Sequence, residues 1–354
     1  MTSICSRCET LPTLQQERGT LHLRLPQGHT SSKVLTVLKE HPFDYVQEAG
    51  IFSIEVESDH LPFVLALQKQ LSWLEQTDIH VLFEPCARKL TLADYLEACS
   101  LATYSARLQS GWLLALLQED RLTTVFQPIV YSEQLNEVFA YESLMRGRDE
   151  QGMVSPLRML EVARGADLLF QLDLAARRSA IRNASEHKLS ANIFINFAPT
   201  SIYDPSFCLR STLKLIDSLG LKREQIVFEV VESEHIASAS HLQRILHFYR
   251  EQGFRVALDD LGAGYSSLNL LHELKPDFVK LDMALIRNIH QEPFKAVMVA
   301  KLIEAAQELN IRVIAEGVEI AEEYHWLNER RVHYQQGYFF AKPGLPPPIA
   351  SPKL

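Results

Sequence analysis

Two adjacent aspartates, Asp259 and Asp260, end the apolar segment 254–258, and Gly262 and Gly264 follow them at once. If the segment is a strand, neighbouring side chains point to opposite faces. Paired acids at its end are then awkward unless a group outside the sheet binds both. A divalent cation is such a group, so the segment indicates a metal site at the end of a buried strand.

Polar residues also interrupt most other strand-like apolar segments between residues 123 and 340, each at or near the end of its segment. Buried parallel strands are rich in Val, Ile and Leu, so the polar exceptions are informative. In a barrel the carboxyl ends of the strands converge on one mouth, where active sites are built. Singly, each residue has a structural explanation, such as a helix cap or a charge partner. The residues are Glu142, Asn196, Glu229, Lys280, Glu316 and Gln336, in addition to Asp259 and Asp260.

Five carboxylates in one pocket are too costly as bare charges, so cations or shifted pKa values must compensate them. Oxygen ligands with one amide favour Mg²⁺ or Mn²⁺ over zinc, and the number of acids suits two ions. Two such ions suit in-line displacement at phosphorus. Lys280 would orient or deprotonate the attacking water or offset phosphate charge, and Arg146 could contact a phosphate with its forked guanidinium. The predicted chemistry is phosphodiester hydrolysis.

The order of the segments predicts two domains. Residues 1–105 read as a small α/β domain with helices on a sheet. Residues 90–118 have helical spacing throughout and are expected to form one connecting helix or a pair of helices at the boundary. Residues 106–354 alternate about eight strand-like segments with long helical patterns such as 156–188, which predicts a (β/α)8 barrel. An open doubly wound sheet is the alternative, but the GxGxxG turn that it favours is absent from the sequence.

Composition narrows the range of functions. The net charge of -9 and the pI near 5.8 argue against binding to duplex nucleic acid. The sequence has no signal-peptide pattern and no apolar run long enough for a membrane span, so a cytoplasmic protein is expected. Five cysteines form no disulfide pattern. Cys5 and Cys8 form a lone CxxC, which is either chance spacing or half of a zinc site.

The chain from about Leu113 to Pro343 resembles the EAL-domain cyclic-di-GMP phosphodiesterases. The resemblance depends on eight blocks in the expected order: QPIV, ESLMR, INFAP, FEVVES, DDLGAGYSSL, FVKLD, AEGVE and QGYFFAKP. It implies a TIM-like barrel with one antiparallel strand that hydrolyses cyclic di-GMP to linear pGpG with Mg²⁺ or Mn²⁺, and Ca²⁺ is expected to inhibit. A homodimer through the barrel and a regulatory ligand or protein at the N-terminal domain are further expectations.

The resemblance also assigns residues. Glu142, Asn196, Glu229 and Asp259 look like ligands of a first metal ion, and Asp259 with Asp260 like ligands of a second. Lys280 looks like the water-activating lysine, Glu316 a further catalytic acid, Arg146 a phosphate contact and Gln336 a pocket residue. Glu232 and Glu319 look like supporting acids, and Gly262 and Gly264 let the loop after Asp260 turn.

Three departures from the family pattern stand out: Ser143 replaces Ala in the namesake motif, Ala198 stands where Ser is usual, and LGAG replaces FGTG. None removes a predicted ligand or the lysine, so an active enzyme is the prediction. A receptor that binds cyclic di-GMP and signals through a protein partner is the alternative, and an inert scaffold is a third. The N-terminal domain has no Gly-Gly pair, so a cyclase of the GGDEF type is not expected.

Overall fold

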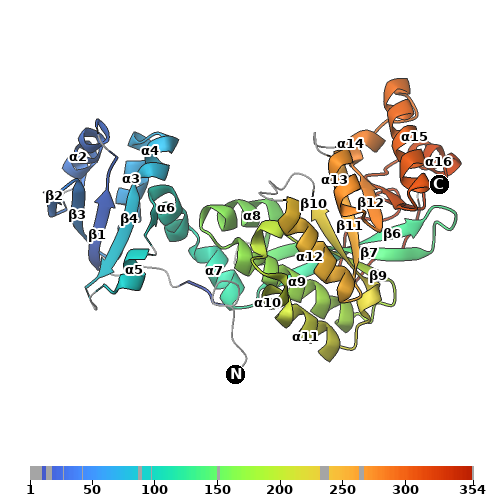
Figure 1. The fold of residues 1–354 in the computed structure, drawn as a ribbon, viewed down its shortest axis with the longest axis horizontal. Coiled ribbons are helices and arrows are strands. Elements are labelled where there is room, and N and C mark those ends of the chain that lie inside the picture. The colour runs from blue at the N-terminus through green and yellow to red at the C-terminus, as the bar shows by residue number, and fades with distance from the viewer. Residues whose placement is uncertain are drawn as a thin grey trace. The chain divides into compact units, whose positions relative to one another are not determined.

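The computed structural model describes residues 10–12, 18–26, 28–41, 43–86, 90–96, 98–149, 152–231, 239–262 and 267–352. The chain divides into two compact units, each with its own sheet (Figure 1). One unit comprises Leu122–Arg148 and Asp173–Leu354, and the other comprises Thr10–Arg121 and Asp149–Leu172. The domain division at residue 105 stays a prediction. No helix within the described ranges is long and apolar enough to cross a membrane.

Eight strands form a closed barrel in the first unit, in the order β6-β14-β13-β12-β11-β10-β9-β7, and β6 pairs with β7 to close the ring. β6 is antiparallel to both neighbours, and the other strand pairs are parallel. The predicted barrel with one antiparallel strand is therefore confirmed. Its strands are β6 (Leu122–Tyr131), β7 (Val138–Asp149), β9 (Asn192–Asn196), β10 (Ile226–Val231), β11 (Arg255–Leu261), β12 (Phe278–Leu281), β13 (Arg312–Ala315) and β14 (Tyr334–Gln336).

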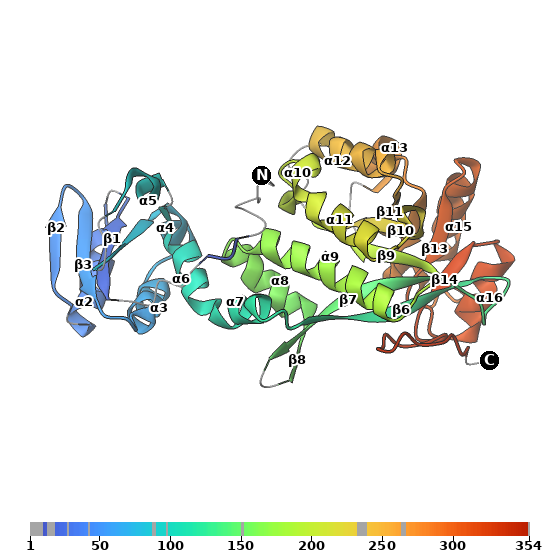
Figure 2. The same cartoon turned by 90° about the horizontal axis from the view of Figure 1, so that it is seen from below.

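Helices follow the strands around the outside of the ring (Figure 2). Short 3-10 turns at Pro199–Ser201 and Arg223–Gln225 lie between them. The helices are α9 (Leu169–Glu186), α10 (Pro205–Cys208), α11 (Arg210–Ser218), α12 (Ala239–Glu251), α13 (Ser267–Leu274), α14 (Met283–Ile286), α15 (Pro293–Glu308) and α16 (Ala321–Glu329).

Two layers of side chains fill the barrel. The first is an apolar floor in which Phe139 and Tyr334 stack with their ring centroids 3.7 Å apart. Side chains alternate along a strand, so the next inward-facing residue is two positions away, and there the chain places its polar residues. Val227 is followed in this way by Glu229, and Phe278 by Lys280. The floor consists of Ile129, Phe139, Ala140, Phe194, Val227, Ala257, Phe278, Ile314 and Tyr334.

The second unit contains a five-stranded antiparallel sheet in the order β2-β3-β1-β4-β5. Its first four strands and two helix segments follow the β-α-β-β-α-β order of ferredoxin-like folds. Buried side chains of β1, β3 and β4 pack on α2, α3 and α6, which confirms a helix-on-sheet domain. Its strands are β1 (Gly19–Arg24), β2 (Tyr45–Glu48), β3 (Ile51–Val56), β4 (His80–Pro85) and β5 (Cys99–Ser100), and the helices between them are α2 (Thr30–Glu40), α3 (Leu61–Gln70) and α4 (Trp73–Asp78).

Residues 90–118 were predicted as one connecting helix or a pair of helices. The pair is present as α6 (Leu101–Gln109) and α7 (Gly111–Gln118), but α5 (Leu92–Leu96) and strand β5 precede it, because β5 pairs with β4 and Ser100 caps α6 by accepting from Thr103 N. The predicted helix 156–188 is likewise two helices, α8 (Pro156–Gly165) and α9, with Asp167 left-handed between them at φ 59°. A short strand, β8 (Gly152–Val154), precedes α8.

Gly337 shows how tightly the barrel closes beside the predicted site. A Cβ atom at this position would lie 2.0 Å from the carbonyl oxygen and 2.4 Å from the nitrogen of Val318. Those backbone groups are engaged, since Val318 N donates to Gln336 O at 3.0 Å and Phe339 N donates to Val318 O at 3.0 Å. The glycine therefore lets the turn after Gln336 pack directly on the loop after Glu316.

We expect Gly337→Ala to lower the free energy of unfolding by about 1–3 kcal/mol or more, because backbone must shift to admit the methyl group. Chemical denaturation of both proteins measures the change. Gly344→Ala is the matched control, since its nearest neighbour would be 3.7 Å from the new Cβ. Equal destabilisation by the two substitutions would contradict the close approach at Gly337.

Candidate active site

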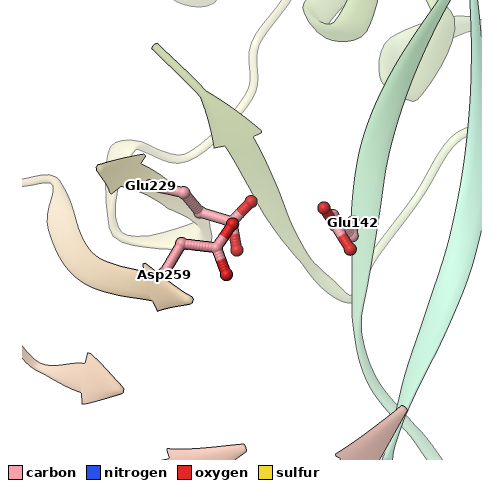
Figure 3. A group of neighbouring side chains, drawn as sticks. All are labelled: Glu142, Glu229 and Asp259. Atoms are coloured by element: carbon pink, nitrogen blue, oxygen red, sulfur yellow. The ribbon is translucent and has the colours of Figure 1, made fainter. Parts of the chain in front are cut away.

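The polar layer above the barrel floor brings together residues that lie far apart in the sequence. Glu142 on β7, Glu229 on β10 and Asp259 on β11 are all buried. Figure 3 shows the carboxylates of Glu229 and Asp259 side by side, with Glu142 facing them from across the barrel. One oxygen of each residue lies within 4.8 Å of the others. The predicted convergence of strand ends on one mouth is therefore seen for these acids.

Lys280, on β12, occupies the centre of the layer with a side chain that is 1% exposed. Its Nζ contacts one oxygen of each of four carboxylates. The distances are 2.6 Å to Glu316, 2.9 Å to Glu229, 3.2 Å to Asp259 and 3.5 Å to Glu142. The lysine therefore joins strands from opposite sides of the barrel.

Two side-chain amides also donate hydrogen bonds to the carboxylate of Glu142. Asn196 Nδ2 donates to Oε1 at 3.4 Å, and Gln336 Nε2 donates to Oε2 at 2.6 Å. The orientation of the Glu142 carboxylate is therefore fixed from β9 and β14. Both amide residues lie where the sequence predicted them.

Gln127 belongs to the same layer and was missed by the sequence analysis. It pairs with Glu142 across β6 and β7 and is 9% exposed. Its inward direction follows from Ile129, two positions away in the apolar floor. The signal was present, since Gln127 is a polar residue within a strand-like segment, but it precedes its floor residue because β6 runs antiparallel.

A local irregularity in β11 explains the two adjacent aspartates. The pairing of β11 with β12 shifts register between Leu258 and Leu261, and Asp260 has a left-handed backbone with φ 57°. Asp260 N donates to Asp259 Oδ1 at 2.9 Å. This bulge breaks the strand alternation, and oxygens of Asp259, Asp260 and Glu316 come within 4.8 Å of one another.

The electrostatics of the layer follow from burial. Burial raises the pKa of Glu229 and of Glu316 well above the ordinary value, although the charge of Lys280 opposes the shift. Burial also raises the pKa of Asp259, and burial together with Asp259 raises the pKa of Asp260 to about 6. For Lys280, burial lowers the pKa, but Asp259, Glu142, Glu229 and Glu316 outweigh it and raise the pKa well above the ordinary value.

The residues fit divalent cations. Glu229 is fully buried, and neither of its oxygens accepts a hydrogen bond from any residue in the described ranges, apart from its ion pair with Lys280. Five carboxylates surround one ammonium, so the ionised cluster has surplus negative charge. Each acidic residue of the cluster offers a carboxylate oxygen as a ligand atom, and hard cations such as Mg²⁺ prefer oxygen ligands. Two overlapping groups are available, Glu142 with Glu229 and Asp259, and Asp259 with Asp260 and Glu316.

Other predicted residues lie around this layer. Burial lowers the pKa of Arg146, opposed by the charges of Tyr338 and Glu142, and its Nη1 donates to its neighbour Met145 O at 2.8 Å. Glu319 accepts from Arg287 Nη2 at 2.6 Å and belongs to neither acidic group.

Gly262 has φ 102°, and a Cβ there would lie 2.4 Å from Leu285 Cδ1, so the turn after the aspartates requires glycine. Two other predicted residues, Glu232 and Gly264, lie outside the described residues, as does the Cys5–Cys8 pair.

Comparison with known proteins gives the family. The EAL domain model matches residues 110–343. Among curated proteins, the probable cyclic di-GMP phosphodiesterase PdeG of Escherichia coli is 31% identical over 232 residues, which cover 64% of this chain and 45% of that protein. Cyclic di-GMP phosphodiesterase PdeR of the same organism is 29% identical, over 64% of this chain and 34% of that protein. The chain thus spans less than half of these relatives.

Solved structures agree with this assignment. A standalone EAL protein of Vibrio cholerae, in its c-di-GMP bound form, is 37% identical with a TM-score of 0.60, over 66% of this chain and 96% of that protein. Klebsiella pneumoniae BlrP1 is 23% identical with a TM-score of 0.58 and covers 92% of this chain and 96% of that protein, a likeness of fold alone. The EAL family model matches about two thirds of this chain, and the barrel carries an acidic cluster at its mouth. The chain therefore belongs to the EAL domain family.

Proposed function

We propose that this chain hydrolyses cyclic di-GMP to linear pGpG, and so lowers the level of that second messenger. The observation that carries the proposal is the complete polar layer, in which Lys280 contacts four carboxylates and two amides hold Glu142. The names of relatives such as PdeG and PdeR support the choice of substrate. The buried acids also favour an enzyme over an inert barrel, since a scaffold gains nothing from their cost.

The cofactor proposed is a pair of Mg²⁺ or Mn²⁺ ions. Glu142, Asn196, Glu229 and Asp259 would hold one, and Asp259 and Asp260, completed by waters, would hold the other. Bound cations would lower the pKa of a water and neutralise charge on the phosphodiester. Ca²⁺ is larger and takes more ligands in looser geometry, so we expect it to bind without supporting hydrolysis.

The protein residues then divide the work. Lys280, with its Nζ within 3.5 Å of four carboxylates, would orient the attacking water and offset negative charge on the phosphodiester. Glu316, 2.6 Å from Lys280, would in its ionised form accept the proton of that water, and the leaving oxygen would take up a proton from solvent. Arg146 contacts a phosphate oxygen, and Gln336 holds Glu142 in place.

We expect purified protein to convert cyclic di-GMP to pGpG with Mg²⁺ or Mn²⁺, and Lys280→Met to lower kcat by about 10²–10⁴-fold while nucleotide binding is retained. Product chromatography and a binding assay in Ca²⁺ measure the two quantities. Lys214→Met, at an exposed lysine on α11, is the matched control and should keep full activity.

Tight binding by the parent without any pGpG would reject the enzyme and favour the receptor. Loss of both binding and hydrolysis in Lys280→Met would contradict a purely catalytic role for this lysine. Glu142→Ala should lose metal-dependent hydrolysis, because two amides and Lys280 lose their shared partner.

We further propose that the barrel forms a homodimer. An exposed apolar stripe on α15 supports this, formed by Phe294, Val297 and Met298, which are 82%, 64% and 50% exposed. Their spacing of three and four places them on one face of the helix. Contiguous exposed apolar surface of this kind marks interaction sites.

The double substitution Phe294→Glu and Val297→Glu should convert the dimer to a monomer, because charges would be buried in the interface. Light scattering after size-exclusion chromatography measures the mass. Ile349→Glu, an exposed apolar residue elsewhere in the barrel unit at 81% exposure, is the control. A parent protein that is monomeric, or a dimer unaffected by the double substitution, would refute this interface.

The small domain of residues 1–105 is proposed to regulate the barrel through a ligand or protein partner. Its ferredoxin-like order and its own apolar core support an independently folding module. A cytoplasmic location stays a prediction of the sequence, as does the identity of the partner.

The raised pKa of Asp260 predicts a dependence of stability on pH. Its pKa is about 6 in the folded metal-free protein, against 3.8 ordinarily, so the folded state retains a proton that the unfolded chain releases. Ionised Asp260 therefore lowers stability, and this loss develops as the pH rises from about 4 to 6. Asp260→Asn removes the acid and tolerates the left-handed backbone.

In metal-free protein we expect the Tm of Asp260→Asn to exceed that of the parent at pH 8 and to equal it at pH 4. Bound Mn²⁺ should reverse the difference, because the neutral amide of the variant binds the cation less tightly than the carboxylate that it replaces. Asp217→Asn is a control of opposite sign, since a hydrogen bond from Arg223 lowers the pKa of Asp217. Equal Tm values for parent and Asp260→Asn at every pH would contradict the predicted effect.

A further inference from the structure

A buried ion pair lies outside the barrel strands, between Asp173 and Arg177 on α9. Arg177 Nη2 is 2.8 Å from Asp173 Oδ2, and the side chains are 2% and 7% exposed. Arg177 Nη1 also donates to Thr212 Oγ1 on α11 at 3.4 Å. Removing two charges from water costs several kcal/mol for each ion. Replacing a buried ion pair by apolar side chains of similar size often leaves a protein equally stable or more stable. The pair therefore calls for a role besides packing.

The other carboxylate oxygen of Asp173 is connected to the polar layer by a hydrogen bond from the backbone. Asp173 Oδ1 accepts a hydrogen bond from Ala198 N at 2.9 Å. Ala198 stands two residues after Asn196, the residue at which β9 ends. Its methyl group can make no hydrogen bond, so Ala198 is tied through its backbone, whose carbonyl accepts from Ser201 N at 2.9 Å.

The turn after Asn196 is held from two sides. Phe197 N donates to Glu229 O on β10 at 3.2 Å, and Ala198 N donates to Asp173 on α9. Arg177 fixes the orientation of the Asp173 carboxylate by binding its other oxygen. Asn196 itself reaches Glu142 at 3.4 Å, a distance at which a small movement of the turn would break the contact.

We propose that Asp173 and Arg177 are positioning residues that act through Ala198 N–H to set Asn196 relative to Glu142 and Glu229. The inference rests on the proposed function, since Asn196 matters as a ligand of the metal ion. Neither Asp173 nor Arg177 touches substrate or metal. Groups that orient metal ligands from behind commonly change metal affinity by about 10–100-fold when they are lost.

Two double variants separate this role from general stability. Asp173→Asn with Arg177→Met removes both charges but keeps an amide oxygen that can accept from Ala198 N–H. Asp173→Leu with Arg177→Met removes both charges and the acceptor, with a side chain of similar shape. We expect the first to bind Mn²⁺ within about threefold of the parent and the second to bind it at least tenfold more weakly.

Mn²⁺ titration by calorimetry or electron paramagnetic resonance, without substrate, measures this difference directly. Kinetics give a second readout, since saturating Mn²⁺ should restore kcat in the Leu variant if only ligand placement is impaired. Ile216→Ala, in the buried face of α11, is the control that lowers Tm without removing the acceptor, and its Mn²⁺ affinity should stay unchanged. Equal Mn²⁺ affinity in the two double variants would overturn the inference.

The outcomes also distinguish this inference from the proposed function. A parent protein that neither binds Mn²⁺ nor forms pGpG would reject the function, and this inference with it. If the Leu variant does not fold, amide hydrogen exchange in the parent gives the decision. Ala198 N–H should then be protected as strongly as the amides of β9, and exchange at the rate of an exposed turn would overturn the proposal.

Discussion

The ammonium of Lys280 is the interaction on which the barrel mouth depends. Four carboxylates, three on strands β7, β10 and β11 and one directly after β13, approach it within 3.5 Å. A single pair of unit charges at 4 Å is worth about 4 kcal/mol at an effective dielectric constant of 20, and burial costs several kcal/mol for each ion. Burial alone lowers the pKa of Lys280, and the charges of the four carboxylates together reverse that shift. The raised pKa of the lysine is the result of that balance.

The alternation of side chains along short strands delivers the acids to this ammonium. An apolar floor residue is followed two positions later by a polar residue on β7, β9, β10, β11, β12 and β14. Because the strands form a closed ring, the apolar residues make one layer and the polar residues make a second layer above it. A single-residue slip would turn these acids toward the helices, so the floor fixes the register of the site. The aromatic packing of Phe139 on Tyr334 therefore supports the geometry of residues that it does not touch.

The sequence predicted the barrel and most of its polar layer because strand burial makes polar interruptions conspicuous. Gln127 escaped the same rule because β6 runs antiparallel, so its polar residue comes before the floor residue Ile129. The convergence of Asp259 and Asp260 on one group required a left-handed residue and a bulge, which no periodicity reveals. The break between α5 and α6 was missed because helical spacing continues across a two-residue strand that only pairing with β4 defines.

Charge balance distinguishes two buried ionic clusters among the described residues of the barrel unit. Asp173 and Arg177 form a pair whose charges cancel, and each also contacts a neutral group, a backbone N–H for Asp173 and a threonine hydroxyl for Arg177. Around Lys280, five carboxylates face one ammonium, so the fully ionised cluster has four unbalanced negative charges. Such an excess requires either protons, as the raised pKa values of Glu229, Asp259, Asp260 and Glu316 indicate, or cations that displace them. The neutral Asp173–Arg177 pair has no excess charge with which to attract an ion, so it can only hold neighbouring groups in position. The acidic cluster around Lys280 has excess negative charge and therefore attracts cations. This difference in charge distinguishes the supporting pair from the site that it supports.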